Sequence, residues 1–209
     1  LEDEGQTVRF PKIGTTATDS ETGNHVGNAA VEEVTIIDAV TYTNLIPGKE
    51  YTVTGTLMDK STGEALTYDG QTFTATQTFT PDQANGSIDL TFTVPGAALL
   101  GKAVVAFEDV AYEGISVGTH ADINDEDQTV YYPQIGTTAI DSETGTHYAL
   151  ADGKVTIKDT VAYTGLLPGR NYVMTGTLMD KATGNLIMDG EEPLTVAQEF
   201  TPEASDGSL

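Results

Sequence analysis

The chain has 209 residues, with 32 acidic against 9 basic side chains and a formal net charge of −23. This charge disfavours nucleic acid and anionic lipid as partners, because both would be repelled. The absence of Cys excludes disulfides, thiol catalysis and cysteine-bound metal. No apolar run has the length of a membrane span, and Leu1–Thr7 lacks the basic end and apolar stretch of a signal peptide. We therefore expect a folded acidic protein with no membrane contact in this stretch.

The sequence repeats itself with a long period. Ile13–Ala17 recurs as Ile135–Ala139, and Tyr51–Lys60 recurs with few changes as Tyr172–Lys181. A repeat of this length is a whole domain and not the short unit of a solenoid. We predict three parts: residues 1–9 end a preceding repeat, residues 10–131 form a complete domain, and residues 132–209 form the first two-thirds of a second, truncated repeat.

The secondary structure is expected to be almost entirely strand. Val34–Tyr42 and Ile88–Val94 alternate between apolar and polar residues, while Tyr51–Thr54 and Thr72–Thr74 are rich in strand-forming types. No stretch shows a helical period, and turns are marked by Pro47-Gly48, Asp69-Gly70 and Asn85-Gly86. The pattern predicts an all-β fold, an immunoglobulin-like β-sandwich in tandem repeat.

Three polar residues fall in phase with the apolar side chains of their strands: Thr15, Asp38 and Gln128. Burying such groups without partners costs about 1–3 kcal/mol each, and more for an ionised carboxylate. They should therefore find one another or other polar partners. The pattern fits a hydrogen-bonded core network, a register displaced by one residue, or a reactive site. Thr137 and Asp159 hold the matching positions in the second repeat.

Two further residues are candidates for the same site. Glu108 ends the run Ala103–Phe107, and because both faces of that run are apolar, the pattern does not assign a face to Glu108. His120 begins an acidic segment that leads to Gln128. A lone His is more often a surface residue than a catalyst, but one near a buried Thr and acid is a candidate proton acceptor.

These residues carry a family resemblance. Val105-Ala106-Phe107-Glu108 resembles the signature of VaFE-repeat surface-anchored proteins of Gram-positive bacteria. The spacing of His, Asp, Asp, Gln and Thr over His120–Thr129 resembles the C-terminal motif of their ester-bond domains. The resemblance implies an immunoglobulin-like domain that joins its first and last strands by a Thr–Gln ester, formed without an external enzyme and with release of ammonia.

By position, the resemblance makes Thr15 the nucleophile and Gln128 the electrophile. Asp38 and Glu108 become assisting acids, and His120 becomes the proton acceptor. Two carboxyls close together in an apolar setting cannot both ionise cheaply, so one is expected to stay protonated.

The second repeat supplies only part of this constellation. Its sequence offers Thr137 and Asp159 but no counterpart of the Glu, His and Gln positions, so no ester is expected within it as given. Gln6 matches Gln128 and is assigned to the preceding repeat.

The implied function is that of a structural stalk or adhesin module, extracellular and anchored to the cell wall. It would react once with itself and would therefore not be a turnover enzyme. It would need neither cofactor nor metal. The expected partners are the adjacent repeats of the chain, with any host ligand bound through other domains.

Two alternatives stay open on the sequence. A Lys–Asn isopeptide domain would need an inward Lys on the first strand, but Lys12 is out of phase with Ile13 and the Asn candidate is Asn124. A calcium-stabilised repeat would use an acidic loop, although the sixth position of such a loop needs Gly and Asp127 stands there. The candidate loop consists of Asp122, Asn124, Asp125, Glu126 and Asp127.

Overall fold

A computed structural model describes residues 6–150 and 153–209 and divides into two compact units, one up to Ile135 and one from Gly136 onward. Throughout the described ranges the regular structure is β-strand without any α-helix, and a short 3₁₀ turn, η2 (Gly96–Ala98), links two strands of unit 1. The predicted all-β class is confirmed. In these ranges, no helix has the length and apolar character needed to cross a bilayer.

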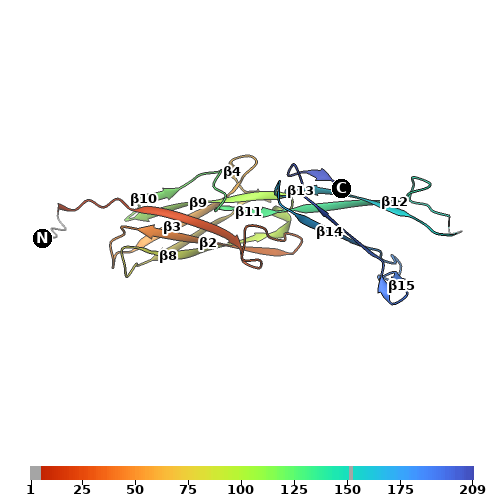
Figure 1. Ribbon diagram of the computed structural model, residues 1–209. Coiled ribbons are helices and arrows are strands. Elements are labelled where there is room, and N and C mark those ends of the chain that lie inside the picture. Colours follow the sequence, from red (N-terminus) through yellow and green to blue (C-terminus); the bar gives the residue numbers. More distant parts are fainter. Residues whose placement is uncertain (1–5, 151–152) are drawn as a thin grey trace. The chain divides into compact units, whose positions relative to one another are not determined.

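Unit 1 is an immunoglobulin-like sandwich of two antiparallel sheets (Figure 1). The first sheet has the order β1 (Lys12–Asp19), β2 (Glu33–Thr43), β8 (Gly86–Pro95). The second has the order β10 (Ile115–His120), β9 (Lys102–Tyr112), β3 (Tyr51–Asp59), β4 (Glu64–Ala65), with β7 (Thr74–Phe79) paired to β3 and β11 (Thr129–Tyr132) paired to β9. The core lies between the sheets.

The predicted alternation of β2 is confirmed. Val34, Ile36, Asp38, Val40 and Tyr42 are buried, and the residues between them are partly or fully exposed. Successive side chains of a strand point to opposite faces, so a single inward residue identifies the whole inward set. This alternation places the carboxyl group of Asp38 in an otherwise apolar core.

One predicted strand, Thr72–Thr74, is interrupted. β5 (Thr67–Tyr68) and β6 (Gln71–Thr72) form a small hairpin, and β7 begins only after Phe73. The hairpin turns at Asp69-Gly70, whose φ angles of 50° and 78° suit a tight two-residue turn. Because β5 and β6 pair with each other, the strand is interrupted at Phe73, and only β7, after it, pairs with β3.

Unit 2 contains counterparts of the first sheet and part of the second. The described strands are β12 (Gln134–Asp141), β13 (Ile157–Thr164) and β18 (Gly207–Ser208) in one sheet, with β14 (Tyr172–Thr177) paired to β17 (Thr195–Phe200) and β15 (Met188–Asp189) paired to β16 (Glu192–Pro193). Thr137 and Asp159 share the strand phase of the buried Thr15 and Asp38, but both of their side chains are exposed. Alternation identifies a face, but burial also needs a second layer over it.

Candidate functional site

One carboxylate oxygen in unit 1 joins the two predicted cross-link residues. The Thr15 hydroxyl donates a hydrogen bond to Glu108 Oε2 at 3.2 Å, and the Gln128 carboxamide nitrogen donates to the same oxygen at 2.8 Å. The three residues are 8%, 2% and 0% exposed for Thr15, Glu108 and Gln128, respectively. A hydroxyl and a primary amide from opposite ends of the domain therefore meet in a site closed to bulk water.

Strand pairing explains why these side chains meet. Thr15 is one of the buried, inward residues of β1, whereas its neighbour Thr16 is exposed, as the sequence phase predicted. The segment that leads into β11 lies between β1 and β9. The Ala17 N–H donates to the Asp127 carbonyl at 2.9 Å, and the Ala106 N–H donates to the Gln128 carbonyl at 3.2 Å. Backbone hydrogen bonds on both sides thus fix the position of Gln128.

Asp38 and Glu108 form a buried carboxyl pair that reaches across the sandwich from β2 and β9. Burial raises the pKa of Asp38. Burial, together with the negative charge of Asp38, raises the pKa of Glu108 to about 10. At neutral pH the pair therefore holds a proton, and Glu108 carries it.

That proton also provides a hydrogen-bond donor for the buried oxygens of the carboxyl pair. If both groups were ionised, neither Asp38 oxygen nor Glu108 Oε1 would have a donor within the described residues. A proton on Glu108 lets its carboxyl donate to Asp38, the contact that lowers the pKa of Asp38 against the effect of burial. Glu108 Oε2 remains free to accept from the hydroxyl and the amide.

The carbonyl oxygen of Gln128 is buried, and no donor among the described residues reaches it. A buried acceptor without a donor is costly, and such exceptions concentrate at functional sites. Attack on the amide carbon would place negative charge on this oxygen. The acid in contact with the Gln128 side chain is Glu108, through the amide nitrogen.

His120 borders the site on the side nearer to solvent. It ends β10, directly opposite Glu108 in the register with β9. Its Nε2 lies 2.8 Å from Asp125 Oδ2, and both side chains are about one-quarter exposed. A positive charge on His120 lowers the pKa of Asp38. The Thr15 hydroxyl makes its hydrogen bond to Glu108, and the contact of His120 is with Asp125.

Sequence reasoning gave no role to two residues that shape this site. Asp125 was noted as part of the motif and of the candidate calcium loop but not as a partner of His120, and its contact with His120 depends on the turn between them. Gly55 lies opposite Glu108 in the β3–β9 register, and a Cβ there would approach Phe92 to 2.6 Å. A Gly inside a strand often marks a close approach, so that signal was available in the sequence.

The residues of the two alternatives have different surroundings. Lys12 and Asn124 are not among the buried residues, unlike Thr15 and Gln128. Two carboxylates of the acidic loop accept from its own backbone: Asp122 accepts from the Asn124 N–H at 3.0 Å, and Asp125 accepts from the Asp127 N–H at 2.9 Å. Within the described residues, no three or more potential metal ligands gather in one cluster.

Comparison with solved structures supports the fold. A bacterial adhesin from Mobiluncus mulieris, described as containing intramolecular disulfide, isopeptide and ester bond cross-links, matches in two crystal forms. One match has 13% identity and a TM-score of 0.51 and covers 95% of this chain and 96% of the adhesin chain. The other has 15% identity and a TM-score of 0.52 and covers 92% and 95%.

The curated proteins compared with the chain include no match. The family model described as "T-Q ester bond containing domain" matches residues 11–132 and again residues 133–209. These two matches span both repeats and agree with the resemblance that the sequence motifs carry. The chain therefore belongs to the family of T-Q ester bond containing domains.

Proposed function

We propose that unit 1 forms an intramolecular ester between Thr15 and Gln128 and that the chain serves as a reinforced structural module of a bacterial surface adhesin. The observation that carries the proposal is the shared hydrogen-bond acceptor, Glu108 Oε2, at 3.2 Å from the hydroxyl oxygen and 2.8 Å from the amide nitrogen. Holding nucleophile and electrophile in one buried place supplies an effective concentration that free solution lacks.

The proposed reaction has one bond forming and one breaking. The Thr15 oxygen attacks the side-chain carbonyl carbon of Gln128, and the carbon–nitrogen bond then breaks to release ammonia. Glu108 Oε2 accepts the hydroxyl proton and passes it to the leaving nitrogen, since it contacts both groups. The proton already on Glu108 moves to Asp38 during the attack and returns afterwards, so the pair ends as it began.

His120 has two candidate roles, and they make different predictions. The motif resemblance assigns it as the acceptor of the Thr15 proton. The contacts favour Glu108 for that step, with His120 held by Asp125 and acting on the carboxyl pair through its charge. Loss of the imidazole then slows the reaction, whereas loss of the Glu108 carboxyl stops it.

The mechanical consequence follows from the positions of the two residues. An ester from β1 to the segment before β11 would close nearly the whole of unit 1 into one covalent loop. Tension between the ends of the unit would then pass through covalent bonds and would no longer unzip the sheet hydrogen bonds. This suits an extracellular, cell-wall-anchored stalk whose partners are adjacent repeats and whose host ligand binds elsewhere. The ester cross-links named for the Mobiluncus mulieris adhesin support the analogy.

Intact-mass measurement of the protein tests the proposal. The chain is expected to be lighter than its sequence by one ammonia, and peptide mapping should join the Thr15 and Gln128 peptides. Thr15→Ala should restore the full mass. Thr16→Ala, which alters the exposed neighbour, and Lys12→Ala, which removes the isopeptide candidate, should both keep the deficit. A wild-type chain at full mass contradicts the ester.

A further inference from the structure

Lys60, in the turn after β3, brings a positive charge to the segment that carries Gln128. Its Nζ donates to Glu126 Oε1 at 2.7 Å and to Thr129 Oγ1 at 2.9 Å. Its backbone is fixed to β9, because the Lys60 N–H donates to the Ala103 carbonyl at 3.0 Å. A cation anchored on the second sheet therefore contacts residues on either side of Gln128.

The contact with Thr129 is the buried one. Thr129 is 0% exposed, whereas the side chain of Glu126 is 65% exposed. The Thr129 hydroxyl donates its single proton to the Asp125 carbonyl at 2.6 Å, so its oxygen can accept from Lys60. An exposed ion pair contributes little in water, while a charged donor that satisfies a buried hydroxyl contributes more. The effect of Lys60 is therefore expected to pass mainly through Thr129.

Thr129 closes the turn that presents Gln128. Its hydroxyl binds the Asp125 carbonyl, and its N–H donates to the Glu126 carbonyl at 3.2 Å. Gln128 lies within this turn, and Asp125 at its start contacts His120 at 2.8 Å. A displacement of the turn would therefore move the reacting amide and the partner of His120 together.

We propose that Lys60 is a positioning residue for ester formation, a role that rests on the proposed function. By fixing Thr129, its ammonium group holds the turn in the position where the Gln128 amide contacts Glu108. Because Lys60 acts through Thr129, its loss should slow the reaction without abolishing it.

The rate of ammonia loss from the freshly refolded full chain, followed by time-resolved mass spectrometry, tests this role. Lys60→Met removes the charge and should slow the loss about tenfold, equivalent to about 1.4 kcal/mol in activation free energy. Lys60→Arg keeps a charged donor and should recover most of the rate. Glu126→Gln should have little effect, because the ion pair is largely exposed.

A double-mutant cycle tests the route through Thr129. Thr129→Val removes the acceptor and keeps the shape of the side chain, so it should slow the loss as Lys60→Met does. In the Thr129→Val chain, Lys60→Met should then have little further effect, since both changes remove the same contact. If Lys60→Met does not refold, Thr129→Val decides, and an unchanged rate in that chain overturns the role.

Lys102 is a control for general stability. It forms a partly buried ion pair with Asp59, the last residue of β3. Lys102→Met should lower the unfolding midpoint without slowing ammonia loss. In the Thr15→Ala chain, where no ester can form, hydrogen exchange of the Thr129 N–H should quicken more with Lys60→Met than with Lys102→Met.

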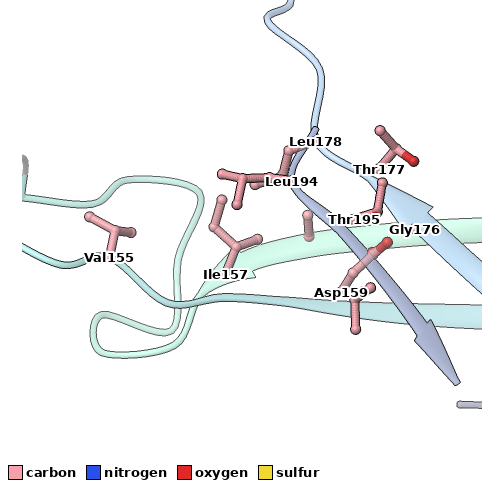
Figure 2. A pocket seen from close by; sticks show the side chains of 10 residues that line it. Val155, Ile157, Asp159, Gly176, Thr177, Leu178, Leu194 and Thr195 are labelled. Carbon is pink, nitrogen blue, oxygen red and sulfur yellow. The ribbon is translucent and has the colours of Figure 1, made fainter. Parts of the chain in front are cut away.

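Lys181, the unit 2 counterpart of Lys60, is a second control, and its side chain is exposed. Figure 2 shows Asp159 of the same unit lining a pocket with Gly176. Since the proposed reacting pair lies in unit 1, Lys181→Met should leave the rate unchanged.

The outcomes separate the two proposals. A wild-type chain that keeps its full mass overturns the proposed function and the role of Lys60 with it. If wild type loses ammonia and Lys60→Met loses it equally fast, the role of Lys60 alone is overturned. Equal slowing by Lys60→Met and Lys102→Met assigns the effect to stability and also overturns the role.

Discussion

The Thr15 hydroxyl and the Gln128 carboxamide bind one and the same oxygen, Oε2 of Glu108, from β1 and from the residue before β11. The shared acceptor places the hydroxyl beside the amide that it is proposed to attack. It also gives a single group access to both the proton that must leave and the nitrogen that must receive it. Positioning and proton transfer therefore depend on one side chain.

Removing the nucleophile should lower stability as well as prevent the cross-link. A covalent link that closes a loop of this length stabilises a fold by about 4–5 kcal/mol through the entropy of the unfolded chain, by analogy with a disulfide. Thr15→Ala should therefore lower the denaturant midpoint of unit 1 in equilibrium unfolding. Thr16→Ala is the control and should leave the midpoint nearly unchanged. Equal midpoints for Thr15→Ala and wild type would show that no link closes this loop.

Substitutions around the site should separate the proton relay from the supporting groups. Time-resolved mass spectrometry of freshly refolded chain measures the rate of ammonia loss. Glu108→Gln should abolish the loss, because the amide that replaces the carboxyl at the shared position cannot take up the hydroxyl proton and pass it on. His120→Ala and Asp125→Asn should slow it by similar factors, since the two side chains act as a contacting pair. If His120→Ala alone abolishes the reaction, His120 is the direct proton acceptor.

The sequence predicted most of this site because strand alternation carries burial information. Thr15, Asp38 and Gln128 were expected to point inward, and all three are buried. Glu108 could not be assigned, since the preceding run Ala103–Phe107 is apolar on both faces and so shows no alternation in sequence. Its position required the register with β3 and β10, which pairs segments distant in sequence.

Strand alternation carried no information on three other features. Asp159 shares the phase of Asp38 but is exposed, because alternation reports which side chains share a face and not whether a second sheet covers it. The contact between His120 and Asp125 depends on the path of a loop, for which no periodic signal exists. The break at Phe73 depends on competition between two pairings, a local hairpin and the β3 edge.

The carboxyl pair predicts the direction in which stability changes with pH before the ester forms. The pKa of Glu108 rises from its ordinary value of 4.5 to about 10 through burial and the charge of Asp38. Between these values the folded state keeps a proton that the unfolded state loses, so the free energy of unfolding falls as pH rises, by at most about 1.4 kcal/mol per pH unit for one proton. Below the lower value the group favours neither state.

This dependence is measured in the Thr15→Ala chain, where no ester can form. Urea unfolding between pH 5 and 9 — within the window set by the Glu108 values of 4.5 and about 10 — should give a midpoint that declines with pH. Adding Glu108→Gln should flatten the decline, since the amide does not titrate. A midpoint that rises across this range would show that Glu108 is ionised in the folded unit.

Because Gly55 has no side chain, Phe92 and Leu90 can pack closely against β3 opposite Glu108. A Cβ at Gly55 would lie 2.6 Å from Phe92 Cζ and 2.9 Å from Leu90 Cδ1, and both of these core side chains are buried. Gly55→Ala should therefore destabilise unit 1 by about 1–3 kcal/mol through overpacking. Because the clash lies in the strand next to Glu108, it should also slow ammonia loss.

Gly176, the unit 2 counterpart of Gly55, provides a matched control within the same chain. A Cβ at this position meets only Val196 Cγ1, at 3.5 Å, which is an ordinary contact. Gly176→Ala should leave the unfolding midpoint of unit 1 and the rate of ammonia loss unchanged. Equal reaction rates and equal unfolding midpoints for Gly55→Ala and Gly176→Ala would contradict this prediction. They would show that the core around Phe92 can accept a methyl group at Gly55 without strain.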